Sequence, residues 1–592
     1  MRLDVPYREL SAEEKDFVLN GEPVQQHVVV SGGGGRQVTL NVTYDNAITA
    51  ARKSEKSKYL ITHRCPVCHG TRLRPEALAS RLDGRDLAEL SELDLDELAA
   101  FAHQLPTLMP AELSRLTTGL VGELIAAIAP LRELGLGYLG LDRAGSTLST
   151  GERQRIELTS TVRANTTGML YVLDEPSVGL HPSNVDGLRK TIDALAHNGN
   201  SVVVVEHDLD VIRTADWVIE MGPGAGRLGG TILAEGRPAE LEKNKKSIIG
   251  PYLAGHATVG RPQRPPTNGH AAVTVSSLYN LRDVTAAFPV GRLTAFAGPS
   301  GAGKTALVLE SLVPAARAQL AGEPLPGHVA KLVLGSVRQV VEIDATPIGL
   351  NARSTPGTYT GAFDAVRARF AAASGLAAGH FSFNTKQGQC PTCKGLGSLD
   401  LDVQYLPDIT VDCPTCHGAR FTDGTLAVRV DGLTIADVLQ LTVAEALERY
   451  ADVPAIARPL RPVADVGLGY LRLGEPTPAL SGGESQRLRI AARLRSSQRD
   501  VLYVLDEPST GLHPVDIGTL VGVFDRLLDD GATIVVIDHD LDLLAAADHV
   551  IDLGPAGGPG GGRIVAQGTP DEVAADPASV TGPYLRGSRA SS

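Results

Sequence analysis

Apolar residues follow two patterns along this chain. Short apolar runs, such as residues 293–297 (Leu-Thr-Ala-Phe-Ala) and 202–205 (four valines), are typical of buried strands. Residues 75–143 instead intersperse leucine and alanine with charged residues, as packed amphipathic helices do. Because strand and helix patterns alternate further on, we predict an α/β fold. Residues 1–60 are polar and predict irregular chain, in which residues 31–36 (Ser-Gly-Gly-Gly-Gly-Arg) form a flexible loop.

The sequence contains an internal duplication. Residues 148–155 (Leu-Ser-Thr-Gly-Glu-Arg-Gln-Arg) match residues 480–487 (Leu-Ser-Gly-Gly-Glu-Ser-Gln-Arg). A second motif, Tyr-Val-Leu-Asp-Glu-Pro-Ser-x-Gly-Leu-His-Pro, occurs at residues 171–182 and again at 503–514. Each copy lies 332 residues after its counterpart, so the chain carries two homologous modules in tandem.

One motif occurs a single time. Residues 298–305 (Gly-Pro-Ser-Gly-Ala-Gly-Lys-Thr) form the P-loop pattern G-x-x-x-x-G-K-T, which does not occur earlier in the sequence. An apolar strand precedes it and a helical pattern follows at residues 306–312, as a P-loop requires. Its backbone N–H groups suit phosphates, its lysine reaches the β and γ oxygens, and its threonine ligates Mg²⁺. We therefore predict an ATP site whose loop residues are Gly298, Ser300, Gly301, Gly303, Lys304 and Thr305.

Each module also has an apolar strand that ends in two acids. In the second module, Asp506 is placed to hold Mg²⁺ and Glu507 to polarise the water that attacks the γ-phosphate. His539 follows a β-branched run, where its ring can sense that phosphate. We predict Glu507 and His539 as catalytic residues. The matching first-module residues, expected to form a degenerate second site, are Asp174, Glu175 and His207.

The duplicated Leu-Ser-x-Gly-Glu segment opens a helix. Its serine, its small residues and the helix N-terminus suit the capture of a phosphate held by another module. The P-loop is therefore expected to pair with the first module, through Ser149, Gly151 and Glu152. Thr150 stands where the second copy has Gly482, and we expect its side chain to crowd the phosphate. The degenerate site is completed by Ser481, Gly482 and Gly483.

All six cysteines lie in Cys-x-x-Cys pairs. Cys390, Cys393, Cys413 and Cys416 have the spacing C-x₂-C-x₁₉-C-x₂-C, which predicts a closed, tetrahedral, structural Zn²⁺ site. Cys65 and Cys68 match its second half but have no partner pair at the corresponding distance. We expect a metal-free remnant there; the alternative is a mixed site completed by His63 or His69.

Composition limits where the chain works. Its net charge is −13, so contacts with nucleic acid must come from local basic patches. No apolar run is long enough for a membrane span, and the first residues lack the apolar core of a signal peptide. We expect a cytoplasmic protein that does not engage a membrane.

The motifs together are those of the ABC ATPases. The cysteine-rich insert, the duplicated Asp-Glu-Pro-Ser-x-Gly-Leu-His segment and residues 347–361 resemble the UvrA family, the damage-recognition subunit of the bacterial excinuclease. The resemblance covers nearly the whole chain. It implies two tandem ABC-type P-loop ATPase modules, the first incomplete, with helical signature domains and a zinc-binding insert. It also implies ATP, Mg²⁺ and Zn²⁺ as cofactors, recognition of lesions in double-stranded DNA for nucleotide excision repair, a UvrB-like partner and a homodimer.

The chain departs from that family in three ways. UvrA proteins carry a P-loop in each half, so we expect an N-terminally truncated chain or a short form whose first P-loop and UvrB-interaction region would lie before Met1. Ala345 stands where the family has a glutamine near Mg²⁺ and the attacking water. Together with Thr150, it leads us to expect ATP binding with slow or absent hydrolysis.

Other functions stay open at this point. A soluble UvrA-like protein for antibiotic self-resistance would share the nucleotide site, and a degenerate, non-hydrolysing fragment would explain the single P-loop. A transporter ATPase is disfavoured by the zinc insert. Basic residues that flank the zinc module and could meet DNA phosphates are Arg353, Lys386 and Arg420.

The motifs also divide the chain into segments. In order, these are an N-terminal remnant with the orphan cysteine pair (1–75), the first ABC module (76–253), a linker (254–272), the P-loop part of the second module (273–350), a signature-domain insert with the zinc module (351–465), the rest of the second module (466–585) and a tail (586–592).

Overall fold

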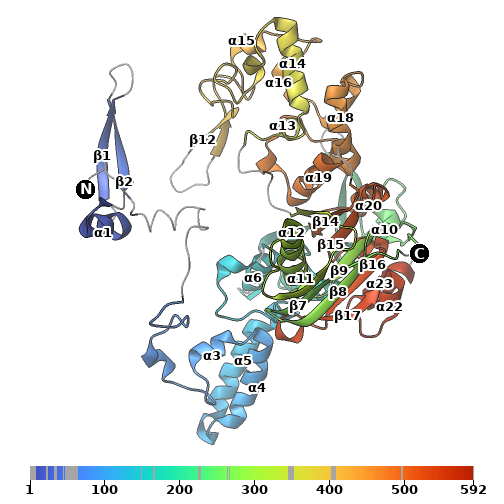
Figure 1. Cartoon of the computed structure of the whole chain (residues 1–592). Coiled ribbons are helices and arrows are strands. Elements are labelled where there is room, and N and C mark those ends of the chain that lie inside the picture. The colour runs from blue at the N-terminus through green and yellow to red at the C-terminus, as the bar shows by residue number, and fades with distance from the viewer. Residues whose placement is uncertain are drawn as a thin grey trace. The chain divides into compact units, whose positions relative to one another are not determined.

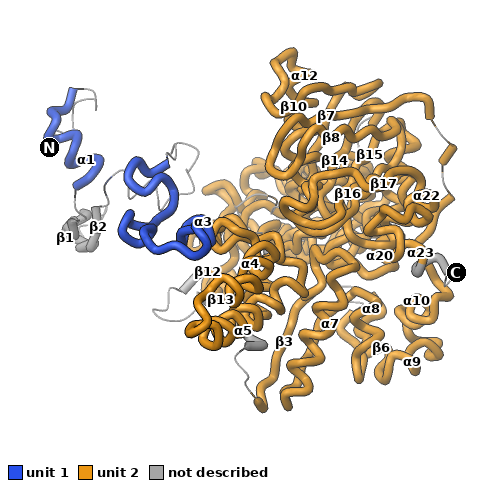
Figure 2. Tube along the Cα trace, turned by 90° about the horizontal axis from the view of Figure 1, so that it is seen from below, with its two compact units in different colours: residues 1–90 blue, residues 91–592 orange. Residues whose placement is uncertain are grey.

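A computed structural model describes most of the chain, namely residues 9–21, 24–31, 37–44, 46, 64–148, 150–163, 167–224, 229–262, 264–265, 267–344, 348, 352–401, 409–494 and 498–590. It divides into two compact units, residues 1–90 and 91–592 (Figure 2). Among the positions singled out above, Ser149, Ala345, His63 and residues 32–36 lie outside the described residues.

The N-terminal unit contains regular structure that was not expected. Helix α1 (Ala12–Asn20) begins at a capping box between Ser11 and Glu14. Strands β1 (Val24–Ser31) and β2 (Gln37–Tyr44) then form an antiparallel hairpin. The expectation of irregular chain is therefore wrong for these elements, because alternating valine and leucine residues in β2 satisfy the period of a strand. Two further helices, η3 (Pro75–Leu78) and α3 (Leu87–Glu92), follow.

The second module is built on a six-stranded sheet of order β11-β14-β15-β9-β16-β17 (Figure 1). The predicted strand at residues 293–297 is confirmed as β9 (Leu293–Ala297), which lies fully buried between β15 and β16. Neighbouring strands run parallel except for β17, which is antiparallel to β16. The other strands are β11 (Gln339–Ile343), β14 (Val501–Asp506), β15 (Thr533–Ile537), β16 (His549–Gly554) and β17 (Arg563–Gly568).

Helices cover this sheet, and a second sheet stands beside it. After the P-loop, three helical segments follow without a break: α11 (Lys304–Leu307), η6 (Val308–Leu312) and α12 (Val313–Ala321). They share a core with an antiparallel sheet of order β10-β7-β8. Its strands are β7 (His270–Leu278), β8 (Leu281–Pro289) and β10 (Val329–Val333).

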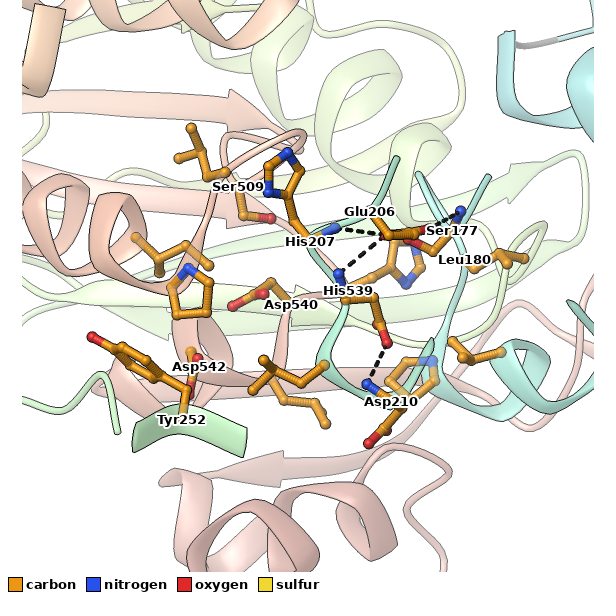
Figure 3. A pocket seen from close by; sticks show the side chains of 18 of the residues that line it. Ser177, Leu180, Glu206, His207, Asp210, Tyr252, Ser509, His539, Asp540 and Asp542 are labelled. Atoms are coloured by element: carbon orange, nitrogen blue, oxygen red, sulfur yellow. Dashed lines mark hydrogen bonds between the residues drawn. The ribbon is translucent and has the colours of Figure 1, made fainter. Parts of the chain in front are cut away.

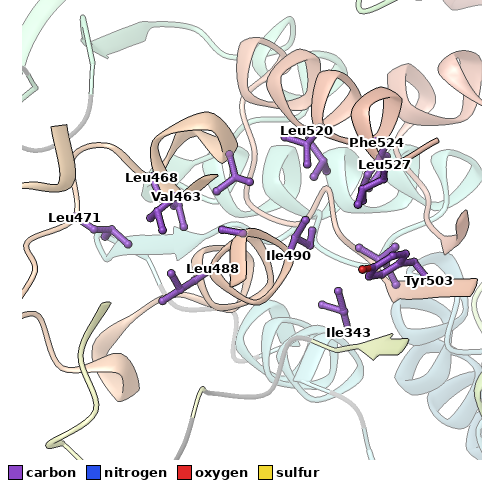
Figure 4. Packing of buried hydrophobic residues seen from close by; sticks show 14 of the residues in the cluster. Ile343, Val463, Leu468, Leu471, Leu488, Ile490, Tyr503, Leu520, Phe524 and Leu527 are labelled. Atoms are coloured by element: carbon purple, nitrogen blue, oxygen red, sulfur yellow. The ribbon is translucent and has the colours of Figure 1, made fainter. Parts of the chain in front are cut away.

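The other face of the central sheet carries α19 (Gly482–Arg493) and α20 (Pro514–Asp529). Leu488 and Ile490 of α19 belong to one core cluster with Phe524 of α20 and Tyr503 of β14 (Figure 4). The same core reaches the helices of the insert. These are α13 (Pro356–Tyr359), α14 (Ala362–Ser374), η7 (Ala378–Phe381), α15 (Asp423–Leu426), α16 (Ile435–Gln440), α17 (Val443–Arg449), α18 (Pro454–Val463) and η8 (Ala464–Leu468), with the short hairpin of β12 (Ser398–Leu401) and β13 (Ile409–Asp412) beside the cysteines.

The first module repeats the second half of this fold. Parallel strands β3 (Leu170–Asp174) and β4 (Ser201–Val205) correspond to β14 and β15, and the antiparallel pair β5 (Val218–Gly222) and β6 (Thr231–Gly236) corresponds to β16 and β17. The helices are α4 (Leu95–Leu108), α5 (Ala111–Glu133), α6 (Thr150–Arg163), α7 (Pro182–His197), α8 (Leu209–Ile212), α9 (Pro238–Leu241) and α10 (Gly250–Leu253), with α21 (Leu541–Ala546), α22 (Pro570–Ala575) and α23 (Gly582–Ala590) as the counterparts of the last three. In the described part of this module, no strand joins β4 to β5 as β9 joins β15 to β16.

The two modules therefore differ in how one sheet face is covered. Leu502 and Val504 of β14 are fully buried beneath the P-loop helix, whereas their counterparts Leu170 and Val172 are 62% and 65% exposed. The same contrast holds between Val535 of β15, fully buried, and Val203 of β4, 50% exposed. The helices that the structure describes include none with both the length and the apolar character of a membrane span.

The segment between the modules is anchored rather than solvated. Val259 is buried in the core of the second module, and the Arg261 guanidinium forms ion pairs of 2.8 and 2.7 Å with Asp525 and Asp548. The linker predicted at residues 254–272 is therefore fixed to the second module at Val259 and Arg261, where buried ion pairs hold the arginine in place.

Candidate nucleotide site and candidate metal centre

The P-loop connects the carboxyl end of β9 to α11. Gly298, at φ +125°, leaves no room for a side chain, since an added Cβ would lie 2.1 Å from the carbonyl oxygen of Leu553. Gly303 has φ +103° and precedes the first helical residue. Both glycines adopt backbone conformations that other residues rarely tolerate. The loop is therefore shaped by its own neighbours and presents its amides at the start of a helix.

Lys304 lies buried within the loop. Its Nζ donates hydrogen bonds of 2.7 Å and 2.9 Å to the carbonyl oxygens of Gly298 and Pro299. Burial lowers the pKa of Lys304 to about 8, while the carboxylates of Glu507, Asp552 and Asp506 act in the opposite direction. Thr305, the next residue, is exposed.

The acidic residues lie close to this lysine. Asp506 ends β14, and Glu507 follows it in the left-handed region at φ +45°, a strained conformation typical of functional sites. Burial and the neighbouring carboxylates raise the pKa of Asp506 to about 6 and that of Glu507 to about 7. Lys304 lowers both pKa values, which places the three groups in one electrostatic cluster.

His539 is the last of the predicted site residues that the second module contributes. The preceding residue, Asp538, is buried and accepts hydrogen bonds from the His539 amide at 2.7 Å and the Ser509 hydroxyl at 2.5 Å. Burial, and then the charge of Lys304, lower the pKa of His539 well below its usual value. The ring is therefore neutral, and its buried Nδ1 atom has no hydrogen-bond partner among the residues that the structure describes.

The first module reaches this site across the module boundary. The Ser300 hydroxyl donates a hydrogen bond of 3.2 Å to the carbonyl oxygen of Gly179. A Cβ added to Gly179 would lie 3.5 Å from Oε2 of Glu507. Gly151 lies at the start of α6, where its carbonyl oxygen accepts a 3.1 Å hydrogen bond from Arg155. Glu152 is buried, with its carboxylate bonded to Tyr138 at 2.5 Å and to Arg143 at 3.4 Å.

The equivalent residues of the other site also come together. Glu175 has φ +44°, as its counterpart Glu507 does, and lies 3.6 Å from Nε2 of His207. This hydrogen-bond partner raises the pKa of His207. Ser481 caps α19 by accepting a 3.2 Å hydrogen bond from the Glu484 amide, and Gly482 and Gly483 form the first turn of that helix. Asp174 ends β3. The described residues place no P-loop beside this group.

A cleft of about 500 Å³ lies between the residues of the P-loop site and those of the second site. Ser177 and His207 of the first module face Ser509 and His539 of the second across it (Figure 3). The same relation links Gly511 to Glu175, since an added Cβ on Gly511 would lie 3.0 Å from its carboxylate. Each module therefore offers a left-handed glycine to the glutamate of the other.

Sequence reasoning missed the residues that cross between modules. Gly179 contacts the P-loop, Tyr138 lies against it, and the charge of Arg155 acts on Glu507. Arg155 and Gly179 stand in the duplicated motifs but were assigned no role at the site, and Tyr138 lies outside those motifs. The duplication carries a signal for Tyr138, because Gly-Leu-Gly-Tyr-Leu occurs at residues 135–139 and again at 467–471.

The four predicted cysteine ligands form a compact, buried cluster. Their sulfur atoms all lie within 4.8 Å of one another. The distance from Cys390 Sγ to Cys413 Sγ is 3.9 Å and that from Cys393 Sγ to Cys416 Sγ is 3.6 Å. A tetrahedron with Zn–S bonds of about 2.3 Å has edges of about 3.8 Å, so the donor set fits a four-coordinate zinc ion.

Cys65 and Cys68 form the same backbone turn as Cys413 and Cys416 but no cluster of four cysteines. The His69 amide bonds to the Cys65 carbonyl at 2.8 Å, as the His417 amide does to that of Cys413. Cys65 is exposed. Within the residues that the structure describes, Cys65 and Cys68 belong to no group of three or more potential ligands.

The three basic residues near the cluster differ in their surroundings. Arg353 donates a 2.9 Å hydrogen bond to the carbonyl oxygen of Lys394, in the first cysteine turn. The Arg420 guanidinium lies over the Phe383 ring, 5.4 Å from its centroid. Lys386 is exposed. Arg420 therefore contributes to the packing beside the cysteine cluster, whereas Lys386 offers a charge at the surface.

Known proteins resemble the chain along nearly its whole length. UvrABC system protein A of Thermus thermophilus is 42% identical over 98% of this chain, and that of Mycobacterium bovis is 41% identical over 98%. The chain spans 63% of the length of each of these curated relatives. No family model matches it.

A solved structure confirms the predicted fold class. The crystal structure of UvrA2 from Deinococcus radiodurans matches with a TM-score of 0.86 and 40% identity, covering 99% of this chain and 76% of that one. High identity over so much of both chains leaves one conclusion. The chain belongs to the UvrA family of ABC ATPases.

Proposed function

We propose that the chain binds ATP at one composite site and uses it to recognise DNA damage in nucleotide excision repair, as a UvrA-type subunit. The observation that carries this proposal is the junction of P-loop and first module, where Ser300 contacts Gly179 at 3.2 Å beside Glu507. The relatives' name, UvrABC system protein A, supports the repair role.

The residues of the second module divide the work at this site. The loop amides and Lys304 hold the phosphates, and the Thr305 hydroxyl and Asp506 hold Mg²⁺. Mg²⁺, when bound, would neutralise part of the negative charge of the phosphates. Glu507, with a pKa of about 7, accepts a proton from the water that attacks the γ-phosphorus, and ADP leaves. Neutral His539 donates or accepts one hydrogen bond near the γ-phosphate.

The first module closes the site with the N-terminus of α6, through Ser149 and Gly151. The second group, which comprises Asp174, Glu175, His207 and the α19 N-terminus with Ser481, Gly482 and Gly483, holds no phosphate-binding loop in the described part of the chain. We assign it a structural, non-hydrolytic role. Ala345 and Thr150 slow turnover at the composite site without preventing ATP binding.

The four-cysteine cluster carries Zn²⁺ in a structural role. Four thiolates close the coordination sphere and leave no position for a substrate. Zn²⁺ bound there would brace the insert. Lys386, with Arg353, faces DNA phosphates, whereas Arg420, which the sequence also offered for this role, packs over Phe383. Membership of the family suggests three partners: double-stranded DNA with lesions, a UvrB-like protein and a second copy of the chain.

Nucleotide and DNA binding of the purified chain test this function. We expect Mg²⁺-dependent ATP binding that Lys304→Ala weakens at least about tenfold, because the buried ammonium contacts the phosphates. Lys331→Ala removes an exposed lysine of β10 and serves as the control. Parent and variant are then compared on ultraviolet-irradiated and undamaged duplexes with and without ATP. ATP binding that survives Lys304→Ala, or equal affinity for both duplexes under all conditions, contradicts the proposal.

A further inference from the structure

Tyr138 belongs to the first module, yet its ring lies against the P-loop of the second. A Cβ added to Gly301 would lie 3.0 Å from three atoms of the Tyr138 ring. A Cβ added to Gly557, in the glycine-rich segment after β16, would lie 2.9 Å from the same ring. Gly301 is thus a glycine because it accommodates this aromatic side chain, in addition to its left-handed φ of +75°.

The P-loop and the glycine-rich segment are held together where they meet the ring. The Asn280 side chain donates hydrogen bonds of 3.0 Å to the carbonyl oxygens of Gly301 and Gly558. Two backbone segments of the second module are therefore fixed to each other on the face that Tyr138 contacts.

The hydroxyl end of Tyr138 reaches helix α6 of its own module, the helix that begins in the duplicated Leu-Ser-x-Gly-Glu segment and is called the signature helix below. Its hydroxyl donates a 2.5 Å hydrogen bond to Oε1 of Glu152, in the first turn of α6. Glu152 is only 6% exposed, and its second oxygen accepts a hydrogen bond from Arg143. Glu152 therefore directs its carboxylate to Tyr138 and Arg143, and the ring forms a rigid bridge between α6 and the P-loop.

The repeat supplies a natural control. Tyr470 is the counterpart of Tyr138, and its hydroxyl donates the same 2.5 Å hydrogen bond to Glu484, in the first turn of α19. Within the residues that the structure describes, no P-loop lies against Tyr470. The bond to the signature glutamate is thus common to both modules, and the contact with a P-loop distinguishes Tyr138.

We propose that Tyr138 is a positioning residue of the composite ATP site. Its ring sets the separation between the P-loop and α6, and its hydroxyl fixes α6 through Glu152. In this role Tyr138 acts through the loop and α6 and not by contact with the nucleotide. This inference rests on the proposed function. A P-loop alone grips the phosphates of ADP, whereas the signature helix grips the γ-phosphate, so Tyr138 contributes to the preference for a triphosphate.

Calorimetric titration with ADP and with a non-hydrolysable ATP analogue, both with Mg²⁺, tests this role in the full chain. We expect Tyr138→Ala to weaken binding of the analogue about tenfold and that of ADP by less than about twofold. Tyr138→Phe keeps the ring and removes the hydroxyl, so we expect an intermediate loss of about threefold for the analogue alone. Tyr470→Ala leaves both affinities within about twofold of the parent.

The outcomes separate the two proposals. Equal losses for ADP and the analogue in Tyr138→Ala would mean that the ring only supports the fold of the loop, and they overturn the inference. Matching losses in Tyr138→Ala and Tyr470→Ala, or unchanged affinities in both Tyr138 variants, overturn it as well. A parent chain that binds neither nucleotide overturns the proposed function first. Circular-dichroism melting of each variant identifies one that is unfolded, in which case Tyr138→Phe decides.

Discussion

The Ser300 hydroxyl of the P-loop donates a 3.2 Å hydrogen bond to the carbonyl oxygen of Gly179, a residue of the other module. Gly179 has φ +70°, and its Cα faces the carboxylate of Glu507. One glycine thus contacts both the loop proposed to hold the phosphates and the acid proposed to activate water. Movement of one module relative to the other must change both contacts together.

Gly179→Ala is expected to lower ATP turnover about tenfold while ATP affinity changes by less than about threefold. The added Cβ would lie 3.5 Å from Oε2 of Glu507, which is an ordinary van der Waals contact, so the expected effect comes from the backbone. A left-handed alanine costs about 1 kcal/mol or more, and relief of that strain shifts the turn that packs against Glu507. The measurement is steady-state ATPase activity beside equilibrium binding. Gly511→Ala is the matched control, since Gly511 has φ +67° and faces Glu175 instead. Similar losses of turnover in both variants would contradict this prediction.

The pKa values at the composite site predict a bell-shaped pH dependence of kcat/KM. Glu507 must be ionised to accept a proton, so activity rises as pH increases through its pKa of about 7. Lys304 must be charged to bind phosphates, so activity falls as pH increases through its pKa of about 8. The profile is recorded at constant ionic strength. A rising limb near the ordinary pKa of a glutamate, about 4.3, would show that Glu507 is not the base.

Local signals explain how much of the site the sequence could predict. An apolar run, a glycine loop and a helix pattern are consecutive in the chain, and they predict β9 and the helix that follows it. Tyr138 has no local signal of this kind, because its contact with Gly301 exists only once the two modules pack together. Only the repeated Gly-Leu-Gly-Tyr-Leu segment marks it, and a repeat does not say which copy meets a P-loop.

Other features were concealed by composition. Val38, Leu40, Val42 and Tyr44 alternate with polar residues in β2, but the glutamine and threonine around them read as irregular chain. Leu170 and Leu502 stand in nearly identical strands, and the sequence of the strand cannot show that one is exposed and the other buried. Burial there depends on β9 and the P-loop helix, which are remote in sequence from β14.

Because one strand face is buried and the matching face is exposed, we predict that shortening the equivalent leucine side chains lowers the free energy of unfolding by different amounts. Leu502→Ala should lower the free energy of unfolding by about 2–5 kcal/mol, because it leaves a cavity in a closed core. Leu170→Ala, at the matching position of an exposed face, should change it by less than about 0.5 kcal/mol. Urea denaturation of both variants measures the two values. Equal destabilisation would mean that the face of β3 is covered in solution.

The cysteine pairs predict a zinc content of one ion per chain. Cys393→Ser removes a ligand from a cluster whose sulfur atoms all lie within 4.8 Å of one another, so we expect loss of the ion and a lower melting temperature for the insert. Cys65→Ser changes an exposed thiol outside any group of ligands in the described residues, and the metal content should not change. Inductively coupled plasma mass spectrometry of the purified chains gives the stoichiometry. Two ions in the parent, with one lost in Cys65→Ser, would instead establish a second metal site at Cys65 and Cys68.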